Sequence, residues 1–184
     1  MQTHLHWKGL ELQSKETCVV STSEALTKVS SVIVGRHKDV PFRVEYILRA
    51  TVHWETVFFQ LHILYGHQPQ SPLLFESDGI GNWTSNGEPA EKFMGCLDVD
   101  LPLTPFTNSL PIHRLQLGIN DEQEIQVLYV DLLENEIKPL RQKYTRLSEH
   151  RYHYQNVPND FEAVITVDEQ GFVVDYPTLF IKTD

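Results

Sequence analysis

Stretches in which apolar and polar residues alternate recur along the whole chain, with turn residues between them. Residues 42–49 show the pattern most clearly, because apolar side chains occupy every second position and charged side chains occupy most of the others. A period of two places the apolar set on one face of a strand, as in an antiparallel sheet with one buried and one solvated side. The same reasoning predicts strands at residues 7–12, 17–22, 29–34, 54–65, 73–77, 80–84, 124–132, 140–147, 151–155, 161–167 and 172–176, and an edge strand at 179–181.

Turn signals separate these strands at hairpin-like intervals. Asp78-Gly79 lies between two predicted strands and is a strong hairpin signal, and residues 168–171 predict the turn of a closing hairpin. Helical periodicity is scarce: residues 21–27 predict one short helical turn, capped by Ser23. About a dozen strands of this kind favour a mainly β protein with little helix, built as a large antiparallel sheet, a sandwich or a barrel.

The most distinctive stretch is residues 95–115, GCLDVDLPLTPFTNSLPIHRL. Residues 96–101 alternate, so Asp98 and Asp100 are expected on one face of a strand, with leucine and valine side chains on the other. Pro102 ends this strand because proline has no N–H to donate. The strand therefore brings two carboxylates to one side of the sheet.

A polar turn is expected to follow at residues 104–109. Pro111 restricts the residue before it to extended conformations, which predicts a second strand at residues 112–115. His113 and Arg114 are adjacent on this strand, so their side chains should point to opposite faces. Two acids, an amide, a histidine and an arginine are thereby expected near one bend.

The pattern GC-x-DVDL-x-x-TPFTN-x-LPI-x-RL in this stretch resembles the centre of a bacterial family, formerly a domain of unknown function, that is now called putative glycolipid-binding. The resemblance covers essentially the whole chain. It departs at Ser109, where threonine is expected, and at His113, where arginine is expected; the second departure removes a permanent charge that an anion would contact. A second segment agrees in order and spacing at Gln142, Tyr144, Thr145, Tyr152, Tyr154, Phe161, Asp168, Gly171, Val173, Asp175, Tyr176, Pro177 and Phe180.

The resemblance implies a strongly curved antiparallel sheet, a half-open barrel whose apolar concave side holds a ligand. The family's functional name rests on a likeness in fold to bacterial lipoprotein carriers and glycolipid carriers. A lipid, a glycolipid or another long apolar molecule is therefore the implied ligand. An unclosed sheet leaves a trough lined by alternate residues, and small molecules commonly bind in the mouths of barrels.

Composition narrows the classes of partner and the compartment. The formal net charge of −10 and the absence of a Lys/Arg cluster argue against nucleic acid or an anionic membrane surface as the main partner. Cys18 and Cys96 do not form a C-x-x-C pair and are expected to be free, buried thiols. Residues 1–12 lack the apolar run of a signal peptide, and no stretch reaches the roughly 20 apolar residues of a membrane span, so we expect a cytoplasmic protein. No linker or repeat divides residues 1–184, which predicts a single domain.

Asp98 and Asp100 admit two interpretations. Side chains two residues apart on a strand are close enough to perturb each other's pKa, as paired carboxylates in acid–base catalysis do. Alternatively, each accepts hydrogen bonds from Arg114, Thr107, Asn108 or the backbone and holds the bend, since a buried charge must be paired. We favour the second interpretation.

The neighbouring polar residues are also ambiguous. Thr104, Thr107 and Asn108 are suited to hydrogen-bond sugar hydroxyls, but threonine and asparagine beside prolines also form local caps and turns. His113 or Arg114 is suited to an anionic headgroup, and only one of them should reach it.

Aromatic side chains are the remaining candidates for a ligand trough, because tyrosine and tryptophan combine an apolar body with a polar tip. Core packing is the alternative, since a large sheet needs bulky side chains to fill it. The aromatic candidates are Trp54, Trp83, Phe106, Tyr144, Tyr152 and Tyr154.

Signals for other chemistry are weak. The pairs His4-x-His6 and His150-x-x-His153 have no acid at an interpretable ligand spacing, so we expect no metal site. There is no G-x-S-x-G nucleophile motif and no phosphate-binding loop, and we expect no cofactor.

We therefore predict a non-enzymatic protein that binds a lipid, a glycolipid or a similar long apolar molecule on the concave side of its sheet. The alternatives are a hydrolase or isomerase that uses Asp98 or Asp100 with His113, and a protein-interaction module. The expected ligand contacts are Trp54, Trp83, Asp98, Asp100, Thr104, Phe106, Thr107, Asn108, His113, Arg114 and Tyr144.

Overall fold

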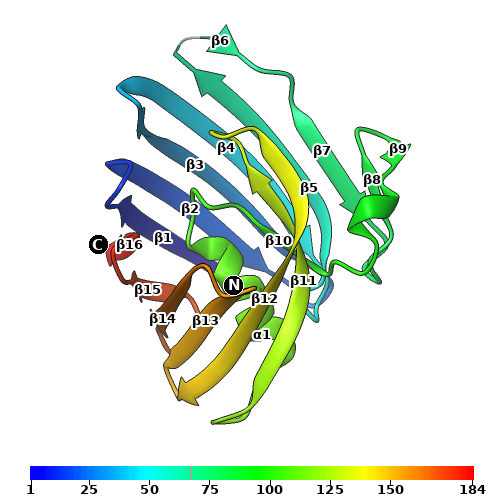
Figure 1. Ribbon diagram of the computed structural model, residues 1–184, viewed down its shortest axis with the longest axis vertical. Coiled ribbons are helices and arrows are strands. Elements are labelled where there is room, and N and C mark those ends of the chain that lie inside the picture. Colours follow the sequence, from blue (N-terminus) through cyan, green and yellow to red (C-terminus); the bar gives the residue numbers. More distant parts are fainter. Residues whose placement is uncertain (67) are drawn as a thin grey trace.

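A computed structural model of the chain shows one β-sheet of sixteen strands that curls around the helix α1 (Figure 1). The structure describes residues 1–66 and 68–184. The helical elements are the 3-10 helix η1 (Glu91–Phe93) and the α-helix α1 (Phe106–Leu115). The strands are β1 (Gln2–Gly9), β2 (Ser14–Thr22), β3 (Thr27–His37), β4 (Val40–Ala50), β5 (Thr56–Tyr65), β6 (Gln68–Pro69), β7 (Leu73–Ser77), β8 (Trp83–Ser85), β9 (Glu88–Pro89), β10 (Asp98–Asp100), β11 (Glu122–Asp131), β12 (Glu136–Ser148), β13 (Arg151–Val157), β14 (Glu162–Val167), β15 (Val173–Tyr176) and β16 (Phe180–Thr183).

The order of the strands explains the open shape of the sheet. The hydrogen-bonded path runs β10-β11-β12-β13-β14-β15-β16-β1-β2-β3-β4-β5-β7-β8-β9, and β6 pairs with β5. Among the described residues the two ends of this path, β10 and β9, do not pair with each other, so the sheet is not closed into a barrel. The strand pairs are antiparallel apart from β10 and β11, which are parallel. The expected mainly β, half-open barrel with little helix is thus confirmed.

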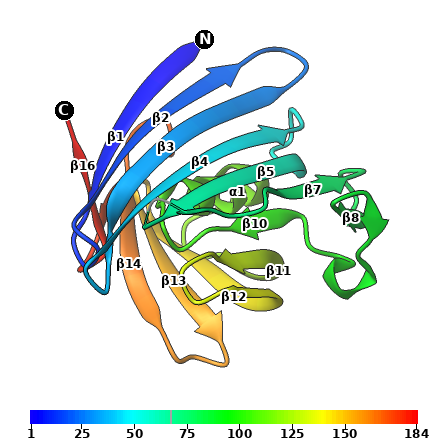
Figure 2. The ribbon, with the colours of Figure 1, turned by 90° about the horizontal axis from the view of Figure 1, so that it is seen from above.

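The concave side of the sheet is filled by the chain itself. The apolar side chains predicted to face inward from β4 are all buried, as alternation along the strand requires. Residues 93–112 occupy the space opposite them, and Phe93, Leu101, Phe106 and Leu110 belong to the same apolar core as the sheet. Figure 2 shows α1 inside the curl of the strands. The interior is therefore a packed core with cavities at its margins, and not an open trough.

The polar turn predicted at residues 104–109 and the second strand predicted at residues 112–115 are wrong. The helix α1 replaces both, and Pro111 lies inside it. The side chains from Phe106 to Ile112 are all buried, so the helix has no solvated face and shows no amphipathic period in the sequence. Burial on every side overrides the tendency of proline to end a helix.

Two smaller predictions also differ from the structure. Residues 21–27 contain a tight turn instead of a helical one, in which Ser23 Oγ accepts the backbone N–H groups of Ala25 at 3.4 Å and Leu26 at 3.1 Å. The edge strand predicted at residues 179–181 is β16, which pairs with both β1 and β15 and so lies inside the sheet. Its hydrogen bonds join the two ends of the chain.

The cysteines and the lengths of the helices bear on two of the expectations drawn from the sequence. Cys18 and Cys96 are free and buried, as predicted. In the described part of the chain, no helix combines the length and the apolar character that a membrane crossing demands.

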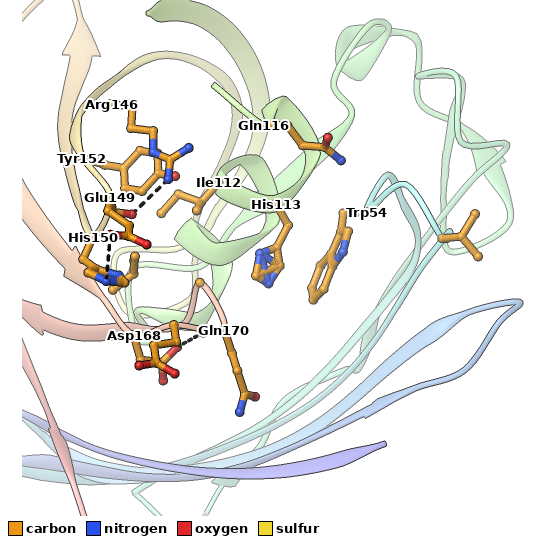
Figure 3. A pocket seen from close by; sticks show the side chains of 14 residues that line it. Trp54, Ile112, His113, Gln116, Arg146, Glu149, His150, Tyr152, Asp168 and Gln170 are labelled. Carbon is orange, nitrogen blue, oxygen red and sulfur yellow. Dashed lines mark hydrogen bonds and ion pairs between the residues drawn. The ribbon is translucent and has the colours of Figure 1, made fainter. Parts of the chain in front are cut away.

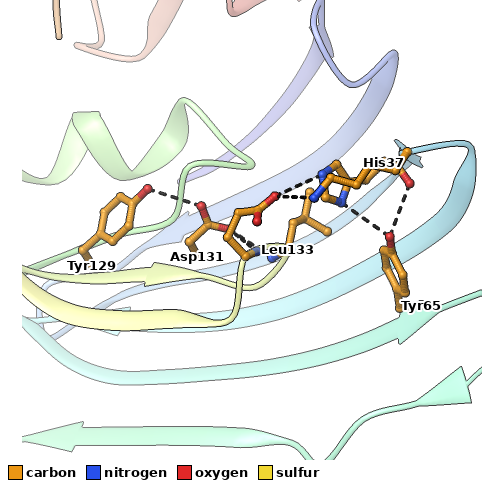
Figure 4. Close-up of polar contacts among 7 residues, drawn as sticks. His37, Tyr65, Tyr129, Asp131 and Leu133 are labelled. Carbon is orange, nitrogen blue, oxygen red and sulfur yellow. Dashed lines mark hydrogen bonds and ion pairs between the residues drawn. The ribbon is translucent and has the colours of Figure 1, made fainter. Parts of the chain in front are cut away.

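Charged side chains tie together two hairpins that are far apart in the order of the strands (Figure 4). Glu134, in the turn between β11 and β12, accepts a hydrogen bond from Lys38 Nζ at 3.0 Å and lies 3.3 Å from His37 Nε2. Asp131 accepts the backbone N–H of Glu134 at 3.0 Å and a hydrogen bond from the Tyr129 hydroxyl at 3.4 Å. The β11–β12 hairpin is thereby tied to the β3–β4 hairpin.

The filling of the concave side predicts the cost of removing one helix side chain. Phe106 is fully buried and its ring stacks with that of Phe172 at a centroid distance of 6.3 Å. We expect Phe106→Ala to lower the free energy of unfolding by about 3–5 kcal/mol, since it leaves a cavity between helix and sheet. The matched control is Ile80→Ala, whose parent side chain is 77% exposed, and it should change stability by less than about 0.5 kcal/mol. Urea unfolding measures both; equal effects would contradict a packed interior.

Candidate functional site

A buried ion pair fixes the position of α1 against the sheet. Arg114 Nη2 donates to Asp98 Oδ2 at 2.6 Å, and Arg114 Nε donates to both carboxylate oxygens at 3.2 Å. Asp98 is fully buried and the Arg114 side chain is only 14% exposed. Burial raises the pKa of Asp98, and the adjacent guanidinium offsets part of this rise. The last turn of α1 is thus joined to β10.

Asp100, two residues along β10, is held by neutral donors. Thr107 Oγ1 donates to it at 3.1 Å and Gln142 Nε2 donates at 2.7 Å. Burial raises the pKa of Asp100, and these two hydrogen bonds oppose the rise. Both aspartates therefore accept hydrogen bonds that hold β10 and α1 together, in agreement with the structural interpretation of the pair.

Asp100 also lines a cavity of about 400 Å³ between α1 and the strands of the C-terminal half. Tyr154 and Tyr176 meet edge to face in its wall, with ring centroids 6.2 Å apart. Burial raises the pKa of these two tyrosines and of Tyr129, so their hydroxyls remain neutral hydrogen-bonding groups. We call this space the tyrosine cavity; it is lined by Glu11, Asp100, Pro102, Thr104, Asn108, Tyr129, Lys138, Leu140, Tyr154, Asn156, Asp160, Phe161, Tyr176, Leu179 and Phe180.

Thr104 and Asn108 reach the tyrosine cavity from the side of the helix. Asn108 Nδ2 donates to the Tyr144 hydroxyl at 2.9 Å, which fixes the orientation of the amide. Thr104 Oγ1 accepts the backbone N–H of Phe106 at 3.0 Å and lies 3.5 Å from the Tyr46 hydroxyl. The polar groups of this wall are therefore positioned by the fold itself.

A second, wider cavity of about 930 Å³ lies beside the C-terminal half of α1 (Figure 3). Trp54 and His113 pack edge to face in it, with ring centroids 3.9 Å apart. Burial lowers the pKa of His113 to about 4, so its imidazole is neutral at neutral pH. We call this space the tryptophan cavity; it is lined by Val52, Trp54, Ile112, His113, Gln116, Arg146, Glu149, His150, Tyr152, Val167, Asp168, Glu169, Gln170 and Gly171.

The structure distributes the predicted site residues over these two cavities and the core. Asp100, Thr104 and Asn108 line the tyrosine cavity, and Trp54 and His113 line the tryptophan cavity. The other six line neither of these cavities and support the fold: Trp83, Asp98, Phe106, Thr107, Arg114 and Tyr144.

This distribution does not favour catalysis by an aspartate with His113. Asp100 and His113 face different cavities, and Asp98 is bound to Arg114. The opposite faces predicted for His113 and Arg114 assumed a strand, whereas both lie on the last turn of a helix. Arg114 is nevertheless hydrogen-bonded to Asp98, so of the two residues His113 and Arg114 only His113 lines one of the two cavities.

Sequence reasoning missed several aromatic residues of the tyrosine cavity. Tyr129, Tyr176 and Phe180 are absent from the candidates derived above, although all three line it. Tyr176 and Phe180 belong to the C-terminal positions that carry the family resemblance, and that segment is the signal that would have found them. Tyr129 had a weaker signal, its place in an alternating strand.

Glu16 on β2 is a buried acid that the sequence analysis also missed. Its Oε1 accepts hydrogen bonds from Ser31 at 2.6 Å and Tyr46 at 2.9 Å, while its Oε2 has no partner among residues 1–66 and 68–184. Burial raises the pKa of Glu16 to about 7. The sequence did contain a signal: Glu16 is two residues before Cys18 and four before Val20, so alternation along β2 places all three side chains on the inward face.

The raised pKa of Glu16 predicts how stability depends on pH. Between about 4.5 and 7 the folded protein holds a proton that the unfolded chain has released, so stability should fall as the pH rises through this window and then level off. The loss is of the order of 3 kcal/mol. Glu16→Gln should remove this slope in urea unfolding measured across the window, whereas Glu24→Gln, at an exposed position, should keep it. A slope that survives in Glu16→Gln would assign it to another group.

The buried ion pair predicts a strongly asymmetric double-mutant cycle. Arg114→Leu leaves the Asp98 carboxylate buried and unpaired, and should lower the free energy of unfolding by about 3–5 kcal/mol. Adding Asp98→Asn should recover part of this loss, because the uncompensated charge is then removed. The exposed pair Arg43 and Glu45, 2.7 Å apart, is the control, and Arg43→Leu should cost less than about 1 kcal/mol. Chemical denaturation tests the cycle; no recovery in the double variant would show that the pair is not coupled.

Comparisons with known proteins agree with this architecture. A family model described as putative glycolipid-binding matches residues 4–182. The crystal structure of a DUF1089 family protein from Pseudomonas aeruginosa, at 1.80 Å resolution, is similar to this chain with a TM-score of 0.80 and 33% sequence identity. The similarity covers 91% of this chain and 92% of that one. No curated protein matches the chain.

Proposed function

Because the chain belongs to the putative glycolipid-binding family, we propose that it is a non-enzymatic binding protein for a lipid, a glycolipid or a similar amphipathic molecule. The observation that carries the proposal is the tyrosine cavity, which lies beside the central sequence motif. Residues 1–184 act as one binding domain in this proposal. Its cytoplasmic location remains a prediction.

The chemistry of the tyrosine cavity suits an amphipathic ligand. Tyrosine rings offer an apolar face with a hydroxyl at the end, which fits the junction between a polar headgroup and an apolar chain. Asp100, Thr104 and Asn108 supply hydrogen-bonding atoms along the same wall. A volume of about 400 Å³ lies within the roughly 300–1,000 Å³ of small-molecule sites.

The filled interior limits how such a ligand is held. A long chain does not lie along the whole concave side, since residues 93–112 occupy it. We therefore assign the headgroup and neck to the tyrosine cavity and the rest of the chain to its rim, where Leu140 and Leu179 are half-buried. Each buried methylene contributes about 0.8 kcal/mol, so a few contacts at the rim are sufficient for measurable affinity.

Native mass spectrometry of protein purified without detergent tests the proposal. We expect a reproducible bound mass that solvent extraction identifies as lipid or glycolipid. Leu179→Asp places a charge at the apolar rim and should remove that mass, because transfer of a carboxylate into an apolar contact is costly. Thr183→Asp adds the same charge at an exposed position of β16 and should retain it. An unsubstituted protein of apo mass that lipid panels do not shift would overturn the proposal.

A further inference from the structure

The tryptophan cavity has an unusual backbone at its edge. Trp54 adopts φ of 69°, a left-handed conformation that is rare for a bulky residue. A local turn holds it there: Trp54 N–H donates to the Thr51 carbonyl at 3.0 Å, and Thr51 N–H donates to the Glu55 carbonyl at 2.9 Å. Strained residues of this kind cluster at ligand sites, where the surrounding structure fixes them. The strain here presents an indole ring to the cavity.

His113, beside Trp54, offers a donor and an acceptor that the fold does not use. In the described part of the chain its ring nitrogens have no hydrogen-bond partner, although the residue is largely buried. Packing fixes the ring, because it lies over Gly171, where an added Cβ would come within 2.4 Å of it. A neutral imidazole has one donor and one acceptor nitrogen, and a hydroxyl group complements both.

The positive charges near the tryptophan cavity are few, and the side chains that carry them are held in place by hydrogen bonds. Among the described residues, Arg146 is the one arginine or lysine in its lining. Its three guanidinium nitrogens donate to the carbonyls of Leu117, Ser148 and Glu149 at 2.8, 3.2 and 3.1 Å. Lys182 approaches from β16 and donates to Asp168 at 2.7 Å. Arg146 keeps its positive charge, but Glu149, Asp168 and Glu169 lie in the same lining, so three carboxylates surround one arginine and a phosphate or sulfate is disfavoured.

The acids of the cavity do not form a strong cation site either. Asp168 is neutralised by Lys182, and its Oδ1 accepts the backbone N–H groups of Gln170 and Phe172, each at 3.0 Å. The Glu149 side chain is 80% exposed, so solvent screens its charge. The lining thus favours a neutral ligand with many hydroxyls over a charged one.

We infer that the tryptophan cavity is a second binding site, separate from the tyrosine cavity, and that it takes a neutral carbohydrate. Trp54 supplies the aromatic surface against which the apolar face of a sugar ring packs. His113 and Gln116 supply neutral donors and acceptors for its hydroxyls, and Gln170 supplies its amide N–H groups, since its Oε1 accepts a hydrogen bond from Thr3 Oγ1 at 3.2 Å. A volume of about 930 Å³ has room for more than one sugar ring. This inference does not depend on a lipid in the tyrosine cavity.

Intrinsic fluorescence reports binding at this site directly. The indole N–H groups of Trp7 and Trp83 are bonded to buried carbonyls at 2.8 Å, and both side chains are buried, whereas Trp54 is partly exposed. We expect neutral methyl glycosides and disaccharides to change the emission saturably. A sugar phosphate of the same ring should bind about tenfold more weakly, because the lining has more acids than bases. Choline should give no saturable change.

Variants measured by calorimetry locate the site. Trp54→Ala should weaken glycoside binding by about tenfold, and Gln170→Ala by about three- to tenfold. Gln170 is exposed, so its variant tests the site even if Trp54→Ala does not fold. Gln123→Ala, at an exposed position of β11, is the matched control and should bind as the unsubstituted protein does.

Several outcomes would overturn the inference. They are the absence of saturable binding across the neutral panel, tighter binding of the sugar phosphate or of choline, and binding that is unchanged in both Trp54→Ala and Gln170→Ala. Leu179→Asp separates this inference from the lipid proposal, since it alters the tyrosine cavity alone and should leave glycoside binding intact. Loss of lipid with retention of glycoside, or the reverse, shows which of the two fails.

Discussion

Both cavities exist because α1 lies inside the curl of the sheet, and the buried pair of Asp98 and Arg114 determines where it lies. A sheet with a strongly curved apolar face must cover that face, and here the chain does so with its own central segment. The ion pair adds little net free energy, since desolvation offsets most of the attraction. Its contribution is geometric: the guanidinium contacts both carboxylate oxygens and so fixes the direction of the helix against β10.

Once α1 is fixed, the polarity of each cavity follows from the strands that face it. The helix meets tyrosines, Asp100 and aliphatic rim residues where the tyrosine cavity forms. Near its C-terminal end it meets polar turns of the sheet, and the tryptophan cavity is correspondingly rich in amides, carboxylates and ring nitrogens. One buried helix thus separates an amphipathic cavity from a polar one.

How much of this could be predicted depends on whether the determining interactions are local. The strands could be predicted because apolar and polar side chains alternate between neighbouring residues, as in residues 42–49. The helix could not, because Pro111 and the absence of an amphipathic period are outweighed only by burial in the assembled sheet. The contact of Trp54 with His113 is likewise a product of tertiary structure, since nothing in either segment indicates the other. That polar side chains gather around Asp100 could be predicted from the motif. That these side chains divide between two cavities could not.

The tie between Glu134 and Lys38 has a consequence for how the interior communicates with water. Both side chains are more than half exposed, and an ion pair of this kind contributes no more than about 1 kcal/mol. The apolar contacts of Leu132, Leu133 and Ile137 with the core therefore hold this end of the sheet more firmly than the ion pair does. Dissolved salt screens the pair, so only the smaller part of the tie between the two hairpins depends on ionic strength, and the seal over this end of the core persists when salt is added.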